Sequence, residues 1–360
     1  MKKIGILTSG GDCGGLNAAI RSIFFRAKNK YNMSVIGIQN GTNGLLERPV
    51  NFIELTQNTF SGYLLKQGGT FLGTTNKGNS LNTFEGKTKS SDNSNEIIKG
   101  YRQLGLDGLI IIGGDGSMQI LQNLAKKGNL NIVAIPKTID NDVGATDNSI
   151  GFDTAVHVAT QALDNLHSTA VSHSRSMILE VMGRDAGHIA LSAGIAGGAD
   201  VVLIPEVKYS IDRIINKLNE MKKRGVKHSL IVVAEAVKKE NGQKVIHEFK
   251  DGQKRLGGIG EYVANEIMSK TDIECRVTAL GHVQRGAPPT HNDRILASAF
   301  GTFAVDLLYN KKFDRMVGWK DRKVIDVPIS DAIQTYRNVQ RNDPLVETAL
   351  SLGVYLGEIR

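Results

Sequence analysis

Short apolar runs alternate along the chain with stretches of helical spacing. The four apolar residues at 109–112 have the pattern of a strand buried on both faces of a parallel sheet. Similar runs occur at 3–7, 34–38, 131–135, 176–181, 200–205 and 229–234. Helical spacing occurs at 18–30, 118–124, 153–167, 211–223, 256–269 and 293–308. This alternation predicts an α/β fold of doubly wound, Rossmann-like parallel sheets.

The composition narrows the class of protein. The 360 residues suit one large or two ordinary domains, and 41% hydrophobic with 22% charged residues is typical of a globular protein. No run approaches the ~18 apolar residues of a membrane span, and the run at 4–7 is too short for a signal peptide. Cys13 and Cys275 are too few for a disulfide framework, which favours a reducing compartment. We therefore expect a cytoplasmic protein without a membrane partner.

The formal charge of +8 predicts a polyanionic ligand, which is either a nucleic acid or a phosphorylated metabolite. The basic residues are scattered, and aromatic residues make up only 6% of the chain. Single-stranded nucleic acids are bound on aromatic stacking platforms, which this composition does not favour. We therefore expect phosphorylated small molecules and no nucleic acid.

Two glycine-rich turns connect predicted strands to predicted helices. The strand at 109–112 ends at Gly113 and Gly114, and Asp115, Gly116 and Ser117 lead into the helix at 118–124. Free N–H groups and the helix dipole make such a turn a phosphate site. The acid in it has two interpretations: a ligand of a magnesium ion that bridges phosphate oxygens, or a helix N-cap. The segment 8–17 repeats the design, and neither turn matches the P-loop or dinucleotide patterns.

Two carboxylates follow the strand at 131–135. Asp140 and Asp142 stand two residues apart in a loop that also contains Lys137 and Thr138. One interpretation makes both acids turn residues that bond their own backbone. We favour the other, in which a general base stands beside an acid that organises a metal ion. The polar range 77–95 is predicted to be a mobile surface loop, either a lid or a plain insertion.

Five segments in a fixed order carry a family resemblance. They are 8–12, 113–117, 136–142, 180–184 and 281–286, and together they resemble the 6-phosphofructokinases over nearly the whole chain. The resemblance implies a glycolytic kinase that transfers the γ-phosphoryl group of ATP to O1 of fructose 6-phosphate, with Mg²⁺ as cofactor. It implies two domains with the active site in the cleft between them. The phosphoryl-donor domain would comprise 1–150 plus 284–334, and the fructose 6-phosphate domain 151–283 plus 335–360.

The resemblance also implies roles for individual residues. Asp140 matches the base that accepts the proton of O1, Thr138 a substrate contact, and Arg184 the arginine that stabilises the transferring phosphoryl group. Asp115 and Asp142 match the acids that organise magnesium. Residues matching the ATP loops are Gly11, Gly114, Gly116, Ser117, Asn76, Lys77 and Lys137. Residues matching the sugar-phosphate pocket are Thr138, Met182, Gly183, Arg184, Glu235, His282 and Arg285, joined by Arg175 and Arg276 from a neighbouring subunit of a dimer or tetramer.

The phosphoryl donor is the open question within this family. Pyrophosphate enzymes generally carry aspartate where this chain has Gly116, and that carboxylate would occupy the space of the α-phosphate of ATP. Lys137, in contrast, is the pyrophosphate-type residue, so the pair indicates a mixed-substrate subgroup. Glycine at position 116 leaves the space of the α-phosphate open, whereas the lysine at position 137 can contact the phosphates of either donor. We therefore give more weight to Gly116 and predict ATP as the donor. The alternatives are a pyrophosphate-dependent phosphotransferase and a non-catalytic nucleotide-sensing or nucleic-acid-binding protein on the same fold.

Overall fold

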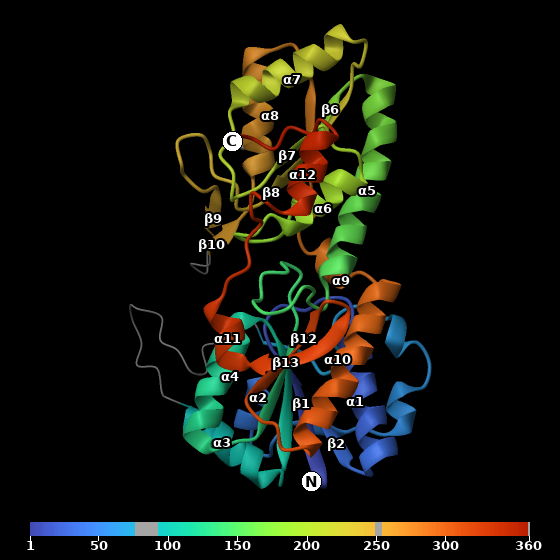
Figure 1. Ribbon diagram of the computed structural model, residues 1–360, viewed down its shortest axis with the longest axis vertical. Helices are drawn as coiled ribbons and strands as arrows, with labels where there is room; N and C mark the ends of the chain where they lie inside the picture. Colours follow the sequence, from blue (N-terminus) through green and yellow to red (C-terminus); the bar gives the residue numbers. More distant parts are fainter. Residues whose placement is uncertain (76–92, 249–253, 359–360) are drawn as a thin grey trace. The chain divides into compact units, whose positions relative to one another are not determined.

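The structure is a computed structural model that describes residues 1–75, 93–248 and 254–358. The chain divides into two compact units (Figure 1). Unit 1 comprises Met1–Thr154 and Arg285–Tyr336, and unit 2 comprises Ala155–Gln284 and Arg337–Arg360. The chain therefore passes from one unit to the other three times, first within helix α5 (Phe152–His173).

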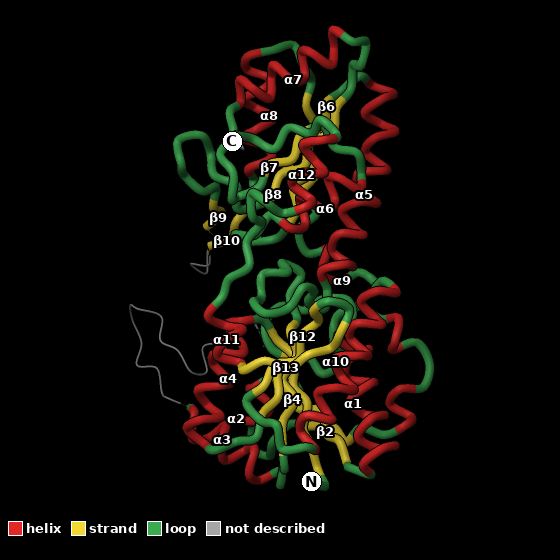
Figure 2. Tube along the Cα trace, viewed as in Figure 1, coloured by secondary structure: helices red, strands yellow, loops and turns green. Residues whose placement is uncertain are grey.

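Unit 1 is built on a seven-stranded sheet with the order β13-β12-β5-β4-β1-β2-β3 (Figure 2). The strands β12, β5, β4, β1 and β2 are parallel, and β13 and β3 are antiparallel edge strands. Their bounds are β1 (Lys3–Thr8), β2 (Ser34–Ile38), β3 (Phe52–Glu54), β4 (Gly108–Gly113), β5 (Ile132–Pro136), β12 (Arg315–Lys320) and β13 (Lys323–Pro328).

Helices cover both faces of this sheet, which explains why β4 and β5 are buried along their whole length. Helices α1 (Leu16–Tyr31) and α10 (His291–Tyr309) pack against each other, and α10 also packs on β4, β5 and β12. A hydrophobic core on the other face joins the sheet to its remaining helices. These are α2 (Thr42–Leu46), α3 (Ser94–Gln103), α4 (Asp115–Gly128) and α11 (Ile329–Gln334).

Unit 2 is built on a parallel four-stranded sheet with the order β11-β6-β8-β7. The strands are β6 (Ser176–Val181), β7 (Val201–Leu203), β8 (Ser229–Ala234) and β11 (Cys275–Ala279). Helix α8 (Ile259–Lys270) packs on the sheet and contacts α7 (Ile211–Lys223), while α6 (His188–Ala196) packs on β7 and β8 and contacts α12 (Pro344–Ser351). A separate hairpin joins β9 (Ile246–Glu248) to β10 (Lys254–Leu256).

The predicted fold class is confirmed, because both units are α/β with parallel sheets. The pattern analysis missed the edge strands β3 and β13 and the strand β12 beside β13, all of which have partial or mixed burial. It also placed residues 94 and 95 in the polar loop, whereas they begin α3; the rest of that loop lies largely outside the described residues. Across the part of the chain that the structure describes, no helix is long and apolar enough to cross a membrane.

Candidate active site

The carboxyl ends of β1, β4 and β5 bring the loops of unit 1 together. β4 pairs in parallel with both β1 and β5, so the segments that follow these strands leave the same edge of the sheet. Backbone hydrogen bonds connect the loops, because Ser9 N donates to Ile112 O at 3.0 Å and Lys137 N donates to Gly113 O at 3.0 Å. Open parallel sheets bind ligands at this edge.

The turn after β4 corrects one of the two interpretations of Asp115. Gly114 occupies the N-cap position of α4, and Asp115 is the first residue of the helix. Its Oδ1 accepts a hydrogen bond from Gly116 N at 2.7 Å. Among the described residues, Oδ2 has no hydrogen-bond partner, so this oxygen is available to a ligand at the helix N-terminus.

Glycine is used for different reasons in the two turns. A Cβ added to Gly116 would meet no atom within 4 Å, so the space beside it is open. Gly10 has φ +82°, and a Cβ there would lie 3.2 Å from Ser117 Oγ and 3.5 Å from Lys137 Nζ. A Cβ on Gly11 would lie 2.6 Å from Nη1 of Arg285. The turn after β1 is therefore crowded by residues from distant parts of unit 1, whereas the turn after β4 has open space at Gly116.

Lys137 lies beneath the turn after β1. Its side chain is buried with 3% of the residue exposed, and its ammonium donates a hydrogen bond to Gly11 O. Burial lowers the pKa of Lys137, and the nearby Arg285 lowers it further. Arg285 Nη1 donates to Asp12 O at 3.1 Å. Two basic side chains thus hold the carbonyl groups of Gly11 and Asp12 and fix the backbone of this turn.

The loop after β5 buries both of its acids. Asp140 and Asp142 are 2% and 5% exposed, and Asp140 N donates to Thr138 Oγ1 at 3.1 Å. Between the two acids, Asn141 adopts the left-handed conformation at φ +54°. Its Nδ2 donates to Asp147 O at 3.1 Å. The residue that provides the turn geometry is therefore the asparagine.

In unit 2, a second group forms at the carboxyl ends of β6 and β8. Gly183 has φ +144° and Arg184 has φ +50°, so the backbone after β6 turns sharply. Arg184 N donates to Glu235 Oε1 at 3.2 Å, and Glu235 N donates to Val181 O at 2.9 Å. Arg184 is an exposed residue. His282, also exposed, follows β11 at the same edge of this sheet.

Two buried polar residues that the pattern analysis did not select support this edge. Gln284 is fully buried; its Oε1 accepts from Met182 N at 2.8 Å and its Nε2 donates to Ala155 O at 3.3 Å. Glu180 accepts hydrogen bonds from Gly258 N at 2.9 Å and Gly260 N at 2.8 Å, which fixes the start of α8. Both lie within the segments 180–184 and 281–286 that carry the family resemblance, but the sequence did not indicate these side-chain contacts.

Arg175 and Arg276 do not join this group. Arg175 precedes β6, whereas the loop with Arg184 follows it, and a strand of six residues spans about 20 Å. Both arginines instead form ion pairs with Glu274. Asn76 and Lys77 lie outside the described residues.

A metal ion would have few protein ligands here. The described residues contain no group of three or more His, Cys, Asp or Glu that could hold a metal ion. Mg²⁺ commonly takes one or two carboxylates together with phosphate oxygens and water. The available oxygen of Asp115 at a helix N-terminus fits that mode of binding.

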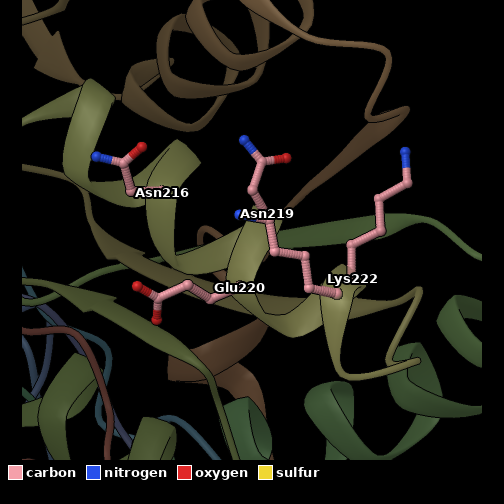
Figure 3. A pocket seen from close by; sticks show the side chains of 5 residues that line it. Asn216, Asn219, Glu220 and Lys222 are labelled. Atoms are coloured by element: carbon pink, nitrogen blue, oxygen red, sulfur yellow. The ribbon is translucent and has the colours of Figure 1, made fainter.

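A hollow on the outer face of α7 is separate from both groups (Figure 3). It has a volume of about 540 Å³ and is lined by Asn216, Asn219, Glu220, Lys222 and Lys223. All five residues belong to α7, and the four side chains labelled in Figure 3 extend from this helix in different directions. It offers no convergent set of groups for chemistry.

Comparison with known proteins gives a consistent result. Residues 3–308 match the family model described as phosphofructokinase. The chain is 55% identical over 357 residues to "ATP-dependent 6-phosphofructokinase 1" of Synechocystis and 54% identical over 359 residues to the protein of that name in Nostoc, with 99% of each chain covered. The crystal structure of Pichia pastoris phosphofructokinase in the T-state matches with a TM-score of 0.80 and 27% identity. That match covers 98% of this chain and 37% of the yeast chain.

Proposed function

The chain belongs to the phosphofructokinase family, and on that premise we propose that it is an ATP-dependent 6-phosphofructokinase. It transfers the γ-phosphoryl group of ATP to O1 of fructose 6-phosphate and produces fructose 1,6-bisphosphate and ADP in glycolysis. The observation that carries this proposal is the identity of 55% and 54% to two proteins named for that activity, over 99% of each chain. We further propose that the enzyme works in the cytoplasm.

The structure of unit 1 supports ATP over pyrophosphate as donor. The space beside Gly116 is open, so a nucleotide phosphate can approach the N-terminus of α4. Lys137, which the family resemblance associated with pyrophosphate, is buried and donates to Gly11 O. Its ammonium therefore supports the loop scaffold, and its presence does not require a pyrophosphate donor.

Phosphoryl transfer depends mainly on positioning and on neutralising charge. We assign Asp140 as the base that accepts the proton of O1 as that oxygen attacks the γ-phosphorus. The Thr138 hydroxyl, which accepts from Asp140 N, fixes the loop that carries this base. The N–H groups at the start of α4 hold donor phosphates, and Arg184 stabilises the negative charge on the transferring group. The carboxylate needs no unusual pKa, because the alcohol proton leaves late in such a reaction.

We assign Asp115 and Asp142 to magnesium. Held by these carboxylates, Mg²⁺ would supply positive charge that offsets the charge of the donor phosphates. Oδ2 of Asp115 has no hydrogen-bond partner among the described residues, and Asp142 is 5% exposed in the loop that carries the base. Gly11, Gly114, Gly116, Ser117, Asn76 and Lys77 are the proposed ATP contacts, and Lys137 belongs to this set through the Gly11 carbonyl that it holds.

We assign the sugar phosphate chiefly to unit 2. Met182, Gly183, Arg184, Glu235 and His282 lie at one edge of its sheet, and Thr138 and Arg285 of unit 1 complete the proposed set. Arg175 and Arg276 lie at the amino ends of β6 and β11, away from that edge. We therefore propose that they contact the sugar phosphate bound to a neighbouring subunit of a dimer or tetramer.

The test uses purified protein with Mg²⁺, fructose 6-phosphate, and either ATP or pyrophosphate in parallel, with sedoheptulose 7-phosphate as a third acceptor arm. We expect faster turnover with ATP. Asp140→Asn should lower kcat by about a hundredfold or more, the usual contribution of a general base, with little change in KM. Faster turnover with pyrophosphate would establish the alternative donor. Nucleotide binding without any transfer would support the non-catalytic alternative, and a filter-binding assay with DNA and RNA would then identify a nucleic-acid partner.

A further inference from the structure

One carboxylate in unit 2 holds two arginines at once. Oε2 of Glu274 accepts a hydrogen bond from Arg175 Nε at 2.7 Å, and Oε1 accepts one from Nη2 of Arg276. Glu274 lies outside the five sequence segments that carry the family resemblance, and no role was predicted for it.

The backbone fixes where these three residues lie. β6 and β11 are parallel, and Cys275 is in register with Ser176. Arg175 and Glu274 therefore immediately precede paired positions on adjacent strands. Ser176 N donates to Glu274 O at 2.9 Å, which locks the two strand starts together. Arg276 is held a second time, because its Nη1 donates to Cys275 O at 3.0 Å.

The contact with Glu274 leaves the two terminal nitrogens of the Arg175 guanidinium available for a ligand. A guanidinium carries five N–H donors. Arg175 uses Nε for Glu274, and its two terminal nitrogens have no hydrogen-bond partner among the described residues. The two cations and one anion leave a net positive charge. A phosphate group is a strong acceptor of such paired N–H groups.

The two ion pairs of Glu274 are expected to add little to the stability of the folded protein. The side chains of Arg175, Glu274 and Arg276 are 29%, 42% and 52% exposed. Ion pairs this exposed typically contribute about 0–1 kcal/mol. A shared carboxylate does, however, restrict the rotamers of two long side chains. That restriction lowers the entropy cost of binding an anion.

We propose that Glu274 is a positioning residue that holds Arg175 and Arg276 as a preformed pair for the phosphate group of the sugar substrate. The proposal rests on the proposed function, in which these arginines bind that phosphate. Glu274 does not touch the substrate. Its contribution is to fix the direction of the Arg175 guanidinium through Nε, so that the terminal nitrogens face outward.

The experiment compares steady-state kinetics of the full-length enzyme with Glu274→Gln, Arg175→Ala and the double variant. The matched control is Asp212→Asn, which removes another exposed ion pair of unit 2, Lys270 Nζ to Asp212 Oδ1 at 2.9 Å. We expect Glu274→Gln to raise KM for fructose 6-phosphate by about tenfold, as for the loss of one charge-assisted hydrogen bond. The KM for ATP, kcat and the oligomeric state should match the wild type, as should all parameters of the control.

The double variant separates positioning from a general structural effect. If Glu274 acts through Arg175, its replacement should raise KM much less in the Arg175→Ala background than in the wild type. An unchanged or lower KM for fructose 6-phosphate in Glu274→Gln would overturn the proposal, since a lower value means that the carboxylate competes with the phosphate. Equal increases in KM for both substrates, loss of the oligomer, or full additivity would also overturn it. A wild-type enzyme without turnover would instead show that the proposed function itself is wrong.

Discussion

The side-chain oxygen of Asn141 accepts a hydrogen bond from the backbone N–H of Ser149 at 3.0 Å, and the hydroxyl of Ser149 lies 3.2 Å from the same oxygen. That hydroxyl also lies 2.7 Å from Thr138 O. The residue between the two buried acids thus connects its own loop to the segment around Ser149. The position of both carboxylates therefore depends on a neutral amide.

This relationship makes a prediction about conformation and hydrogen bonding. Asn141→Gly keeps access to the left-handed backbone but removes the amide, whereas Asn141→Ala also adds a conformational cost of about 1 kcal/mol. We expect kcat to fall about tenfold in the glycine variant and further in the alanine variant, as the acids lose their fixed position. Asn129, left-handed at the C-cap of α4, provides the control. Its glycine and alanine variants should change thermal stability and leave kcat unaltered.

The second prediction concerns the proposed sharing of one sugar-phosphate site between two subunits, in which Arg175 comes from the neighbouring subunit. Asp140→Asn and Arg175→Ala subunits are each impaired, but mixed oligomers would contain sites with both residues intact. When equal amounts of the two variants assemble at random into a cyclic or dihedral oligomer, about a quarter of all sites contain both an intact Asp140 and an intact Arg175. Unfolding and refolding the two variants together should therefore restore about that fraction of wild-type activity at low fructose 6-phosphate. Activity no greater than the sum of the separate variants would place the arginine in its own subunit's site.

The third prediction addresses the open space beside Gly116. A Cβ added to Gly116 meets no atom within 4 Å, so a side chain can leave the backbone there without a clash. Gly116→Asp should keep the wild-type thermal stability but lower kcat/KM for ATP by about a hundredfold, because a second carboxylate repels the phosphates. Gly116→Ala is the control for volume without charge. If both variants lose ATP activity equally, steric exclusion rather than charge determines the donor.

A fourth prediction follows from Asp293, which is fully buried at the start of α10. Burial raises the pKa of Asp293 to about 6, against hydrogen bonds from Gly151 N and Thr154 that lower it. The native state therefore binds a proton more tightly than the unfolded chain, and its stability falls as pH rises through the window between the unfolded and folded pKa values. Between about pH 4 and pH 6 the loss should be about 2 kcal/mol. The free energy of unfolding of wild type and of Asp293→Asn should be measured by denaturation across this pH range. The difference between the two should change with pH by this amount. A difference that stays constant with pH would contradict the prediction.

The two thiols provide the fifth prediction. Cys13 and Cys275 are both free and buried. Burial raises the pKa of Cys13 to about 12 and that of Cys275 to about 11. Because the thiolate is the reactive form, a thiol reagent at about pH 8 should modify neither residue in the native enzyme. Both should react in denaturant. Rapid modification of native Cys13 would show that the turn after β1 opens in solution.

Much of the fold could be predicted because the buried parallel strands carry continuous apolar runs. β4 and β5 are buried at every position, and their pattern in the sequence is unambiguous. The hairpin of β12 and β13 could not be found in this way. β12 is fully buried only at its central positions and β13 at none, and Trp319 pairs with Val324 near the hairpin turn.

The residues of the candidate site could also be predicted only in part, but for a different reason. Glycines and acids at strand ends are visible in a sequence, and the motif residues were found from them. Gln284, Glu180 and Glu274 act through side-chain contacts to segments far away in the chain, at separations of 102, 78 and 99 residues. One sequence contains no pattern that links such pairs, so only the folded chain reveals these supporting contacts.

The threefold passage of the chain between its units has a consequence for biosynthesis. β5 remains an open sheet edge until β12, some 180 residues later, emerges from the ribosome and pairs with it. The loop that carries Asp140 directly follows that edge strand. During about half of translation the nascent chain therefore exposes an unpaired strand edge, and truncation before Arg315 should yield insoluble protein.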